Sequence, residues 1–173
     1  MAGWDQTLTT LMVERGNALK RYGFLLSGED ATAEDLVQDA LVRALGRPFI
    51  ARDLVETEAY VRQIMVNLSI DRHRRLVRWR RSVRLLAARD DLPDPLADLA
   101  ARQDLDTALG RLSPRQRACV VLRYYDDLPI AQVATVLGVG QGTVKRYVNE
   151  ALTRLGNTLA ASEGSTKCPS TQS

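Results

Sequence analysis

The chain has 173 residues, of which 45% are hydrophobic and 26% charged, and this composition fits one globular domain or two small helical ones rather than a disordered chain. No stretch approaches the roughly 18 uncharged apolar residues of a membrane-spanning helix, and the N-terminus lacks the pattern of a secretory signal. The net charge of +3 is unevenly placed: residues 62–89 carry +8 and residues 111–155 carry +4, with −5 over residues 90–110 between them, which favours two contacts with a polyanion.

Helical spacing of apolar residues dominates the first part of the chain. It runs from Leu8 to Leu26 and is interrupted at residues 27–30, which read as a break between helices. Thr32 and Asp35 have the spacing of a capping box and predict that a second helix starts there. The Gly-Arg-Pro sequence at residues 46–48 then ends this helix.

A third, long helix is predicted to start at Thr57. Its apolar stripe consists of Tyr60, Val61, Ile64, Met65, Leu68 and Ile70. No stretch of the chain shows the sustained alternation of a strand. We therefore predict an all-α fold with two small helical domains, an N-terminal bundle over residues 1–89 and a C-terminal domain over residues 108–160.

An acidic, proline-containing linker is predicted over residues 90–107, and a small, polar tail over residues 161–173 is expected to be disordered. The second domain contains a strong helix start, with Ser113 as N-cap, Pro114 at the first helical position and Gln116 at the third. These residue types satisfy the backbone amides that a helix leaves open at its N-terminus.

A helix-turn-helix is predicted within residues 128–155. Ile130–Leu137 forms a short helix, and Gly138 lies where the turn needs a left-handed backbone. Val144 and Val148 anchor the following helix. Its exposed face presents Gln141, Thr143, Lys145, Arg146 and Asn149, whose amide and guanidinium groups suit base edges in the major groove. The alternative reading is a helical hairpin with a solvated charged face.

Three blocks of the sequence resemble bacterial RNA polymerase sigma factors of the extracytoplasmic-function type. Residues 109–155 are similar to the promoter-binding C-terminal domain, residues 33–45 to the core-polymerase-binding helix, and residues 59–75 to the promoter-melting segment. The small size and the Arg-Trp-Arg-Arg stretch at residues 78–81 resemble most nearly the actinobacterial sigma-E-like sub-family. Departures from the family pattern are Gly140, where serine is common, Glu150, where a late arginine is common, and Tyr147, where a basic or polar residue is common.

The resemblance implies a function and a set of sites. The protein would direct core RNA polymerase to promoters in the cytoplasm, binding its clamp coiled coil and flap, and an anti-sigma factor is a possible further partner. Core-polymerase contacts would come from Asp35, Leu36, Gln38 and Asp39. Contacts to the −10 element, as duplex and single strand, would come from Tyr60, Arg62, Asn67, Asp71, Arg72, Arg74, Arg75, Arg78, Trp79, Arg80 and Arg81. Contacts to the −35 element would come from Arg115, Gln141, Thr143, Lys145, Arg146 and Asn149.

Two other classes of function fit the sequence less well. A response-regulator-type transcription factor would bind duplex DNA without polymerase through a similar C-terminal domain, but it would carry a receiver of alternating strands and helices, which the first 90 residues do not predict. A nucleic-acid enzyme needs clustered carboxylates for metal ions or a nucleophile with a base. The sequence offers neither, and Cys119, Cys168 and the single histidine have no zinc-site spacing. We therefore predict no enzymatic activity, no metal and no cofactor.

Overall fold

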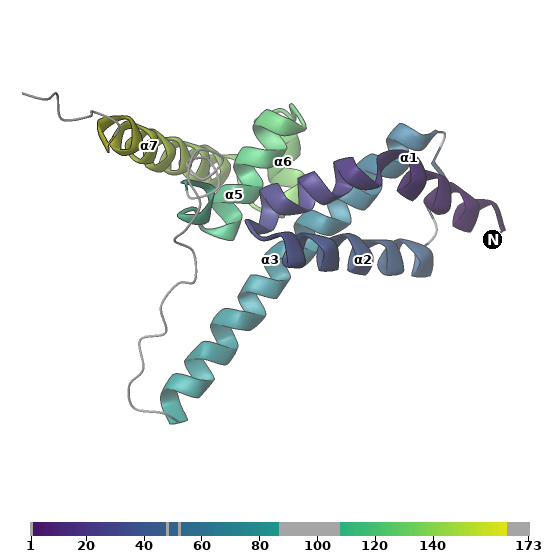
Figure 1. The fold of residues 1–173 in the computed structure, drawn as a ribbon, viewed down its shortest axis with the longest axis horizontal. Coiled ribbons are helices and arrows are strands. Elements are labelled where there is room, and N and C mark those ends of the chain that lie inside the picture. Colours follow the sequence, from purple (N-terminus) through teal and green to yellow (C-terminus); the bar gives the residue numbers. More distant parts are fainter. Residues whose placement is uncertain (1, 48, 52, 87–107, 166–173) are drawn as a thin grey trace, which may run out of the picture. The chain divides into compact units, whose positions relative to one another are not determined.

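The structure is a computed structural model that describes the backbone of residues 2–47, 49–51, 53–86 and 108–165, and their side chains except at 2, 77, 80–86 and 158–165. Its helices are α1 Ala2–Ser27, α2 Asp30–Gly46, α3 Leu54–Leu86, α5 Pro114–Val120, the π-helix η1 Val121–Tyr125, α6 Ile130–Leu137 and α7 Gln141–Ser165 (Figure 1). These described ranges contain no strand, so the predicted all-α fold is confirmed. No helix within them is long and apolar enough to cross a membrane.

The helices belong to two compact units, and each is described by itself. In the first unit α1, α2 and α3 pack against one another in all three pairings. Apolar side chains at helical spacing on each helix form the shared core. Those with at most 1% of their surface exposed are Leu11, Leu19, Tyr22, Leu36, Ala40, Ala44, Val61, Met65 and Val66. The burial of these faces away from water is the main stabilisation of the bundle.

Gly23 marks a close approach between α1 and α2. A Cβ atom at this position would lie 2.9 Å from the backbone oxygen of Ala33 and 3.1 Å from its Cα. Both atoms belong to the backbone, so they cannot move aside as a flexible side chain would. The two helices therefore pack at a distance that only a glycine at position 23 permits.

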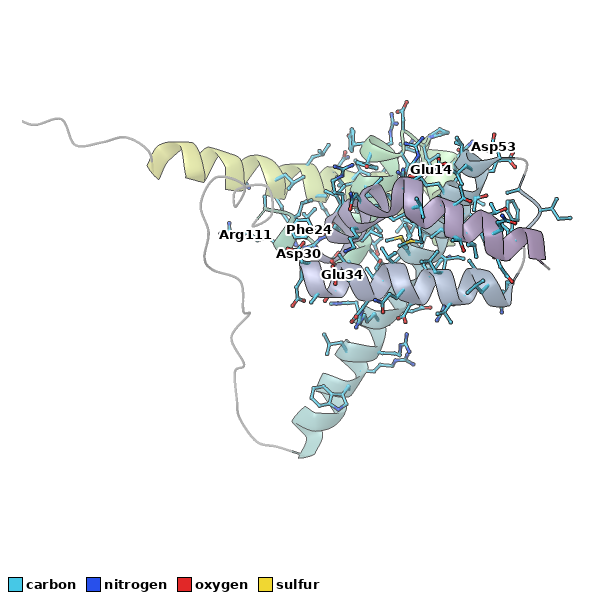
Figure 2. The ribbon with its side chains drawn as sticks, turned by 45° about the vertical axis from the view of Figure 1, so that its right-hand side comes forward. Glu14, Phe24, Asp30, Glu34, Asp53 and Arg111 are labelled. Atoms are coloured by element: carbon cyan, nitrogen blue, oxygen red, sulfur yellow. The ribbon has the colours of Figure 1, made fainter. Side chains whose placement is uncertain are left out.

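The predicted starts of α2 and α3 are wrong by about three residues. Glu29, in extended conformation, is the N-cap of α2, and the hydroxyl of Thr32 donates to the Glu29 carboxylate at 2.7 Å inside the helix. α2 therefore begins only three residues after α1 ends. The start of α3 lies at Leu54, directly after Asp53, which is labelled in Figure 2. The Asp53 carboxylate accepts a hydrogen bond from the amide of Glu56 at 2.8 Å and so caps the helix. Thr57 is buried within the first turn.

In the second unit, the predicted capping box at the start of α5 is confirmed. The Ser113 hydroxyl accepts from the Gln116 amide at 3.3 Å, and the Gln116 side-chain oxygen accepts from the Ser113 amide at 3.1 Å. The guanidinium of Arg117, in the same helix, is buried, and its Nε donates a hydrogen bond to the Leu109 carbonyl at 3.0 Å. These bonds tie the start of α5 to the segment before it.

The turn between α6 and α7 has the predicted geometry. Gly138 has a φ of +62°, its amide donates to the Thr135 carbonyl at 3.3 Å, and the Val139 amide donates to the Ala134 carbonyl at 3.0 Å. This pair of bonds is a Schellman motif with glycine at the left-handed position. Val133 and Val144 are fully buried in this unit, and the side chain of Val148 is only 7% exposed.

The expected disorder of the tail is wrong for its first five residues. α7 continues to Ser165, and the pair of alanines at 160 and 161 favours helix over coil. The rest of the predicted tail, residues 166–173, and the predicted linker, residues 90–107, lie outside the described part of the chain.

Candidate nucleic-acid and polymerase interfaces

The exposed edge of α2 is acidic. Asp35, Gln38 and Asp39 are exposed on it, as the sequence analysis predicts. Leu36, predicted together with them, is only 1% exposed and packs in the core of the bundle, and its contact with polymerase stays a prediction. Its side chain lies under the acidic edge, at the boundary between the core of the bundle and the surface beside Asp39.

The acidic edge of α2 is joined to a basic face of α3. Arg72 Nη2 lies 2.8 Å from Asp35 Oδ2, and each side chain is about half exposed. Beside this pair is a hollow of about 360 Å³, whose polar lining comes from Asp39, Arg72 and Arg75. Leu36 and Leu68 line its apolar part. Opposite charges from two helices therefore meet at one surface of the first unit.

The basic face of α3 continues along the exposed second half of the helix. Its exposed side chains include Asn67, Arg72, Arg74, Arg75, Arg78 and Trp79, together with His73 and Leu76. Trp79 is 60% exposed, which is unusual for a large apolar ring. Asp71 lies one helical turn from Asn67 and is 3.7 Å from Arg74. The side chains of Arg80 and Arg81 lie outside the described part of the chain.

Two residues predicted for this face are half-buried and contact other parts of the bundle. Tyr60 is half-buried, donates from its hydroxyl to the Arg47 carbonyl at 3.0 Å, and stacks on Phe49 with ring centroids 4.8 Å apart. Arg62 forms an ion pair with Glu58, and its guanidinium lies 4.9 Å above the ring of Tyr22. Both positions precede the exposed half of α3, where the helix still packs against α1 and the loop after α2. Both side chains therefore have packing partners within the bundle, and their role as promoter contacts stays a prediction.

The helix-turn-helix presents the predicted polar face. Gln141, Lys145, Arg146 and Asn149 are exposed on the first part of α7, while Thr143 and the α5 residue Arg115 are half-buried. α7 is tied to α5 by a hydrogen bond from Gln116 Nε2 to Glu150 Oε2 at 2.7 Å. This contact between α5 and α7 was not predicted from the sequence. The sequence feature that could have indicated the contact is Glu150, an acidic residue at a position where the family resemblance leads one to expect arginine.

The thiol of Cys119 lies in the interior of the second unit. Burial raises the pKa of the Cys119 thiol from 9.0 to about 11, against a smaller lowering by Arg115. Such a thiol is protonated at neutral pH and is a poor nucleophile and metal ligand. Among the residues that the structure describes, no group of three or more His, Cys, Asp or Glu side chains is placed to hold a metal ion.

Comparisons with known proteins agree with this arrangement. Residues 12–81 match sigma-70 region 2, and residues 102–155 match sigma-70, region 4. The RNA polymerase sigma-E factor of Streptomyces coelicolor is 34% identical over 149 residues, which cover 85% of this chain and 82% of that protein. The ECF RNA polymerase sigma factor SigL of Mycobacterium tuberculosis is 33% identical over 157 residues, covering 88% of each.

A solved structure is similar over nearly the whole chain. It is that of the sigma factor RpoE from Bartonella quintana in complex with the anti-sigma factor NepR, with a TM-score of 0.64, 25% identity, and coverage of 92% of this chain and 98% of that one. The chain therefore belongs to the sigma-70 family of RNA polymerase sigma factors, proteins of transcription initiation that bind promoter DNA. Within this family it is a member of the extracytoplasmic-function (ECF) group.

Proposed function

We propose that the two units of this sigma factor carry three separate binding surfaces. The acidic edge of α2, with Asp35, Gln38 and Asp39, binds a basic surface of core RNA polymerase, the clamp coiled coil. The exposed half of α3 binds and opens the −10 element. The first part of α7 reads the −35 element as duplex.

The exposed half of α3 is the observation that carries the proposal. An open promoter requires that unstacked bases gain new partners, and a base stacked on an aromatic ring gains roughly 1–3 kcal/mol. The exposed ring of Trp79 offers such a platform, and the exposed arginines around it suit the phosphates of the strand. Asn67 and Asp71, one helical turn apart, supply amide and carboxylate groups for the Watson–Crick edge of a flipped base.

The −35 surface follows the geometry of helix-turn-helix proteins. The second helix enters the major groove with its N-terminal residues toward the bases. Gln141, Lys145, Arg146 and Asn149 are exposed on that part of α7 and have the donors and acceptors that distinguish base pairs. Arg115 and Thr143 lie beside them and suit contacts with the phosphate backbone.

We further infer that the protein has no catalytic activity of its own and acts in the cytoplasm, where core polymerase and promoter DNA are found. An anti-sigma factor is a suitable regulatory partner. The similar RpoE structure was solved as a complex with the anti-sigma factor NepR. A bound anti-sigma factor would prevent the acidic edge of α2 from reaching polymerase.

The proposal is tested by transcription in vitro with core RNA polymerase from an actinobacterium, on a fragmented genomic template, with and without the protein. Discrete transcripts that appear only with the protein are expected, and alignment of their start sites yields the promoter motif. Binding to duplex DNA without polymerase, and no transcripts, would instead favour the response-regulator-type alternative.

The polymerase surface has its own test. Asp39 is exposed on the acidic edge, so Asp39→Arg reverses a charge that faces the polymerase and weakens capture of the protein by core polymerase. The matched control is Asp5→Arg, which makes the same reversal at an exposed position in the first turn of α1 and leaves capture unchanged. Equal capture of Asp39→Arg and the unmodified protein would remove Asp39 from the interface.

A further inference from the structure

Arg146, on the DNA-reading face of α7, is held from two sides. Its Nε lies 3.8 Å from Glu150 Oε1, one helical turn further on, and its guanidinium lies 5.4 Å from the ring centroid of Tyr147. Its side chain is nevertheless 64% exposed, so it remains accessible to a ligand. Glu150 and Tyr147 are two of the positions at which the sequence departs from the family pattern.

Glu150 is itself anchored to the interior of the unit. While Oε1 faces Arg146, Oε2 accepts a hydrogen bond from Gln116 Nε2 at 2.7 Å. Gln116 is only 4% exposed, and its oxygen accepts from the Ser113 amide in the capping box and from Arg154 Nη1 at 3.4 Å. The carboxylate facing Arg146 is therefore fixed by a buried side chain of another helix rather than free to follow the arginine.

An anchored carboxylate has two effects on a neighbouring arginine. It restricts the guanidinium to a few orientations, so that less conformational freedom is lost when the arginine binds a base edge. It also places a negative charge close to the DNA backbone, which opposes binding that depends on phosphate attraction alone. Both effects favour discrimination between bases over general affinity for DNA.

We propose that Glu150 is a positioning residue for −35 recognition: anchored by Gln116, it orients Arg146, with Tyr147 on the other side, so that Arg146 reads a base rather than a phosphate. This inference rests on the proposed −35 role of α7. Glu150 touches no DNA in it and acts through Arg146.

The test is Glu150→Gln in holoenzyme assembled with core polymerase, selecting from a promoter library randomised over the −35 element. A glutamine oxygen still accepts from Gln116 Nε2, so the anchor is kept while the charge facing Arg146 is removed. Preference at one base position is expected to fall by about fivefold, the low end of what one side chain contributes by reading a base. The salt dependence of promoter binding is expected to steepen by about one unit, as for one more phosphate contact.

The control is Asp127→Asn. Asp127 pairs with Arg123 at 3.3 Å in the same i,i+4 relationship, outside α7, and asparagine tolerates its positive φ of 51°. The same loss of one negative charge is expected to leave the base preference unchanged. Tyr147→Leu, which removes the ring face but keeps an apolar side chain, is expected to weaken preference at the same base position.

A double-mutant cycle separates positioning from a general charge effect. In an Arg146→Ala background, Glu150→Gln is expected to change the base preference no further, because the residue through which Glu150 acts is absent. An unchanged preference in Glu150→Gln, or an equal change with and without Arg146, overturns the inference. If holoenzyme of the unmodified protein selects no −35 sequence at all, the proposed −35 role of α7 fails as well.

Discussion

Asp35 of α2 and Arg72 of α3 form an ion pair of 2.8 Å across two helices of the first unit. The side chains are 55% and 45% exposed, so water screens their attraction. The pair joins the proposed polymerase surface to the proposed promoter surface. Because it holds the bundle together only weakly, either residue is able to leave it for a stronger partner.

This leads to a first prediction on stability. Asp35→Ala is expected to lower the free energy of unfolding by less than about 1 kcal/mol, and less still in high salt, because exposed ion pairs contribute little. It is also expected to weaken binding to core polymerase. Urea unfolding at two salt concentrations and a pull-down with core polymerase measure the two effects separately.

Glu34→Ala provides the matched control. Glu34 is next to Asp35 along α2, is similarly exposed, and pairs with Lys20 of α1 at the same distance of 2.8 Å. The same small loss of stability is expected, with core binding retained. If Asp35→Ala alone lowers the free energy of unfolding by well above about 2 kcal/mol, Asp35 has a structural role instead.

The second prediction concerns promoter opening. Trp79→Ala is expected to reduce open-complex formation by an amount corresponding to roughly 1–3 kcal/mol for loss of a stacked base, while core binding is kept. Asn67→Ala is expected to reduce open-complex formation through loss of hydrogen bonds to a flipped base, again with core binding kept. Both residues are exposed on α3, so folding does not depend on them. Permanganate reactivity of promoter thymines measures opening. Val55→Ala is the control, because Val55 is also exposed on α3 but lies at the start of the helix. An equal loss of promoter opening and of core binding in Asn67→Ala or Trp79→Ala would contradict the assignment.

The third prediction concerns the contact between α1 and α2. Gly23→Ala is expected to lower the free energy of unfolding by about 1–3 kcal/mol, because the new methyl group meets the Ala33 backbone at 2.9 Å. Gly16→Ala on the same helix meets only the end of the Met12 side chain at 3.5 Å, and we expect it to be neutral or stabilising by up to about 1 kcal/mol. Denaturant unfolding of both variants measures these changes in the free energy of unfolding. Similar effects of the two substitutions would mean that the helices are able to move apart.

The fourth prediction follows from the buried thiol. The pKa of Cys119 is about 11 in the folded protein, above its ordinary value of 9.0. In a Cys168→Ser background, alkylation of Cys119 is therefore expected to be slow at pH 8 and to rise as the pH approaches 11. Since the raised pKa belongs to the folded state, its contribution to stability is complete below pH 9 and is lost between pH 9 and about 11. Labelling at pH 8 as fast as in denaturant would contradict the burial.

Features that depend on neighbouring residues were predictable from the sequence. The Ser113 and Gln116 capping box, the bounds of α6, and the left-handed Gly138 each follow from residues within eight positions of one another. The exposed arginine-rich half of α3 was equally visible, because charged side chains at helical spacing cannot be buried without partners. The roles of these surfaces toward polymerase and promoter stay predictions.

Other features depend on which helices pack together, and only the tertiary structure decided them. Leu36 shares a helix with the acidic residues beside it, and its burial follows from the side of α2 that meets α1 and α3. Arg62 belongs to a basic run in sequence but lies against Tyr22, 40 positions earlier.

The sequence by itself therefore determined the helical class, the helix-turn-helix and the family resemblance, because these arise from short-range hydrogen bonds and periodicity. The tertiary structure decided which charged side chains face solvent and which are already paired, as with Asp35 and Arg72 or Gln116 and Glu150. These partners are more than 30 positions apart in sequence, and only the packing of the helices brings them within hydrogen-bonding distance.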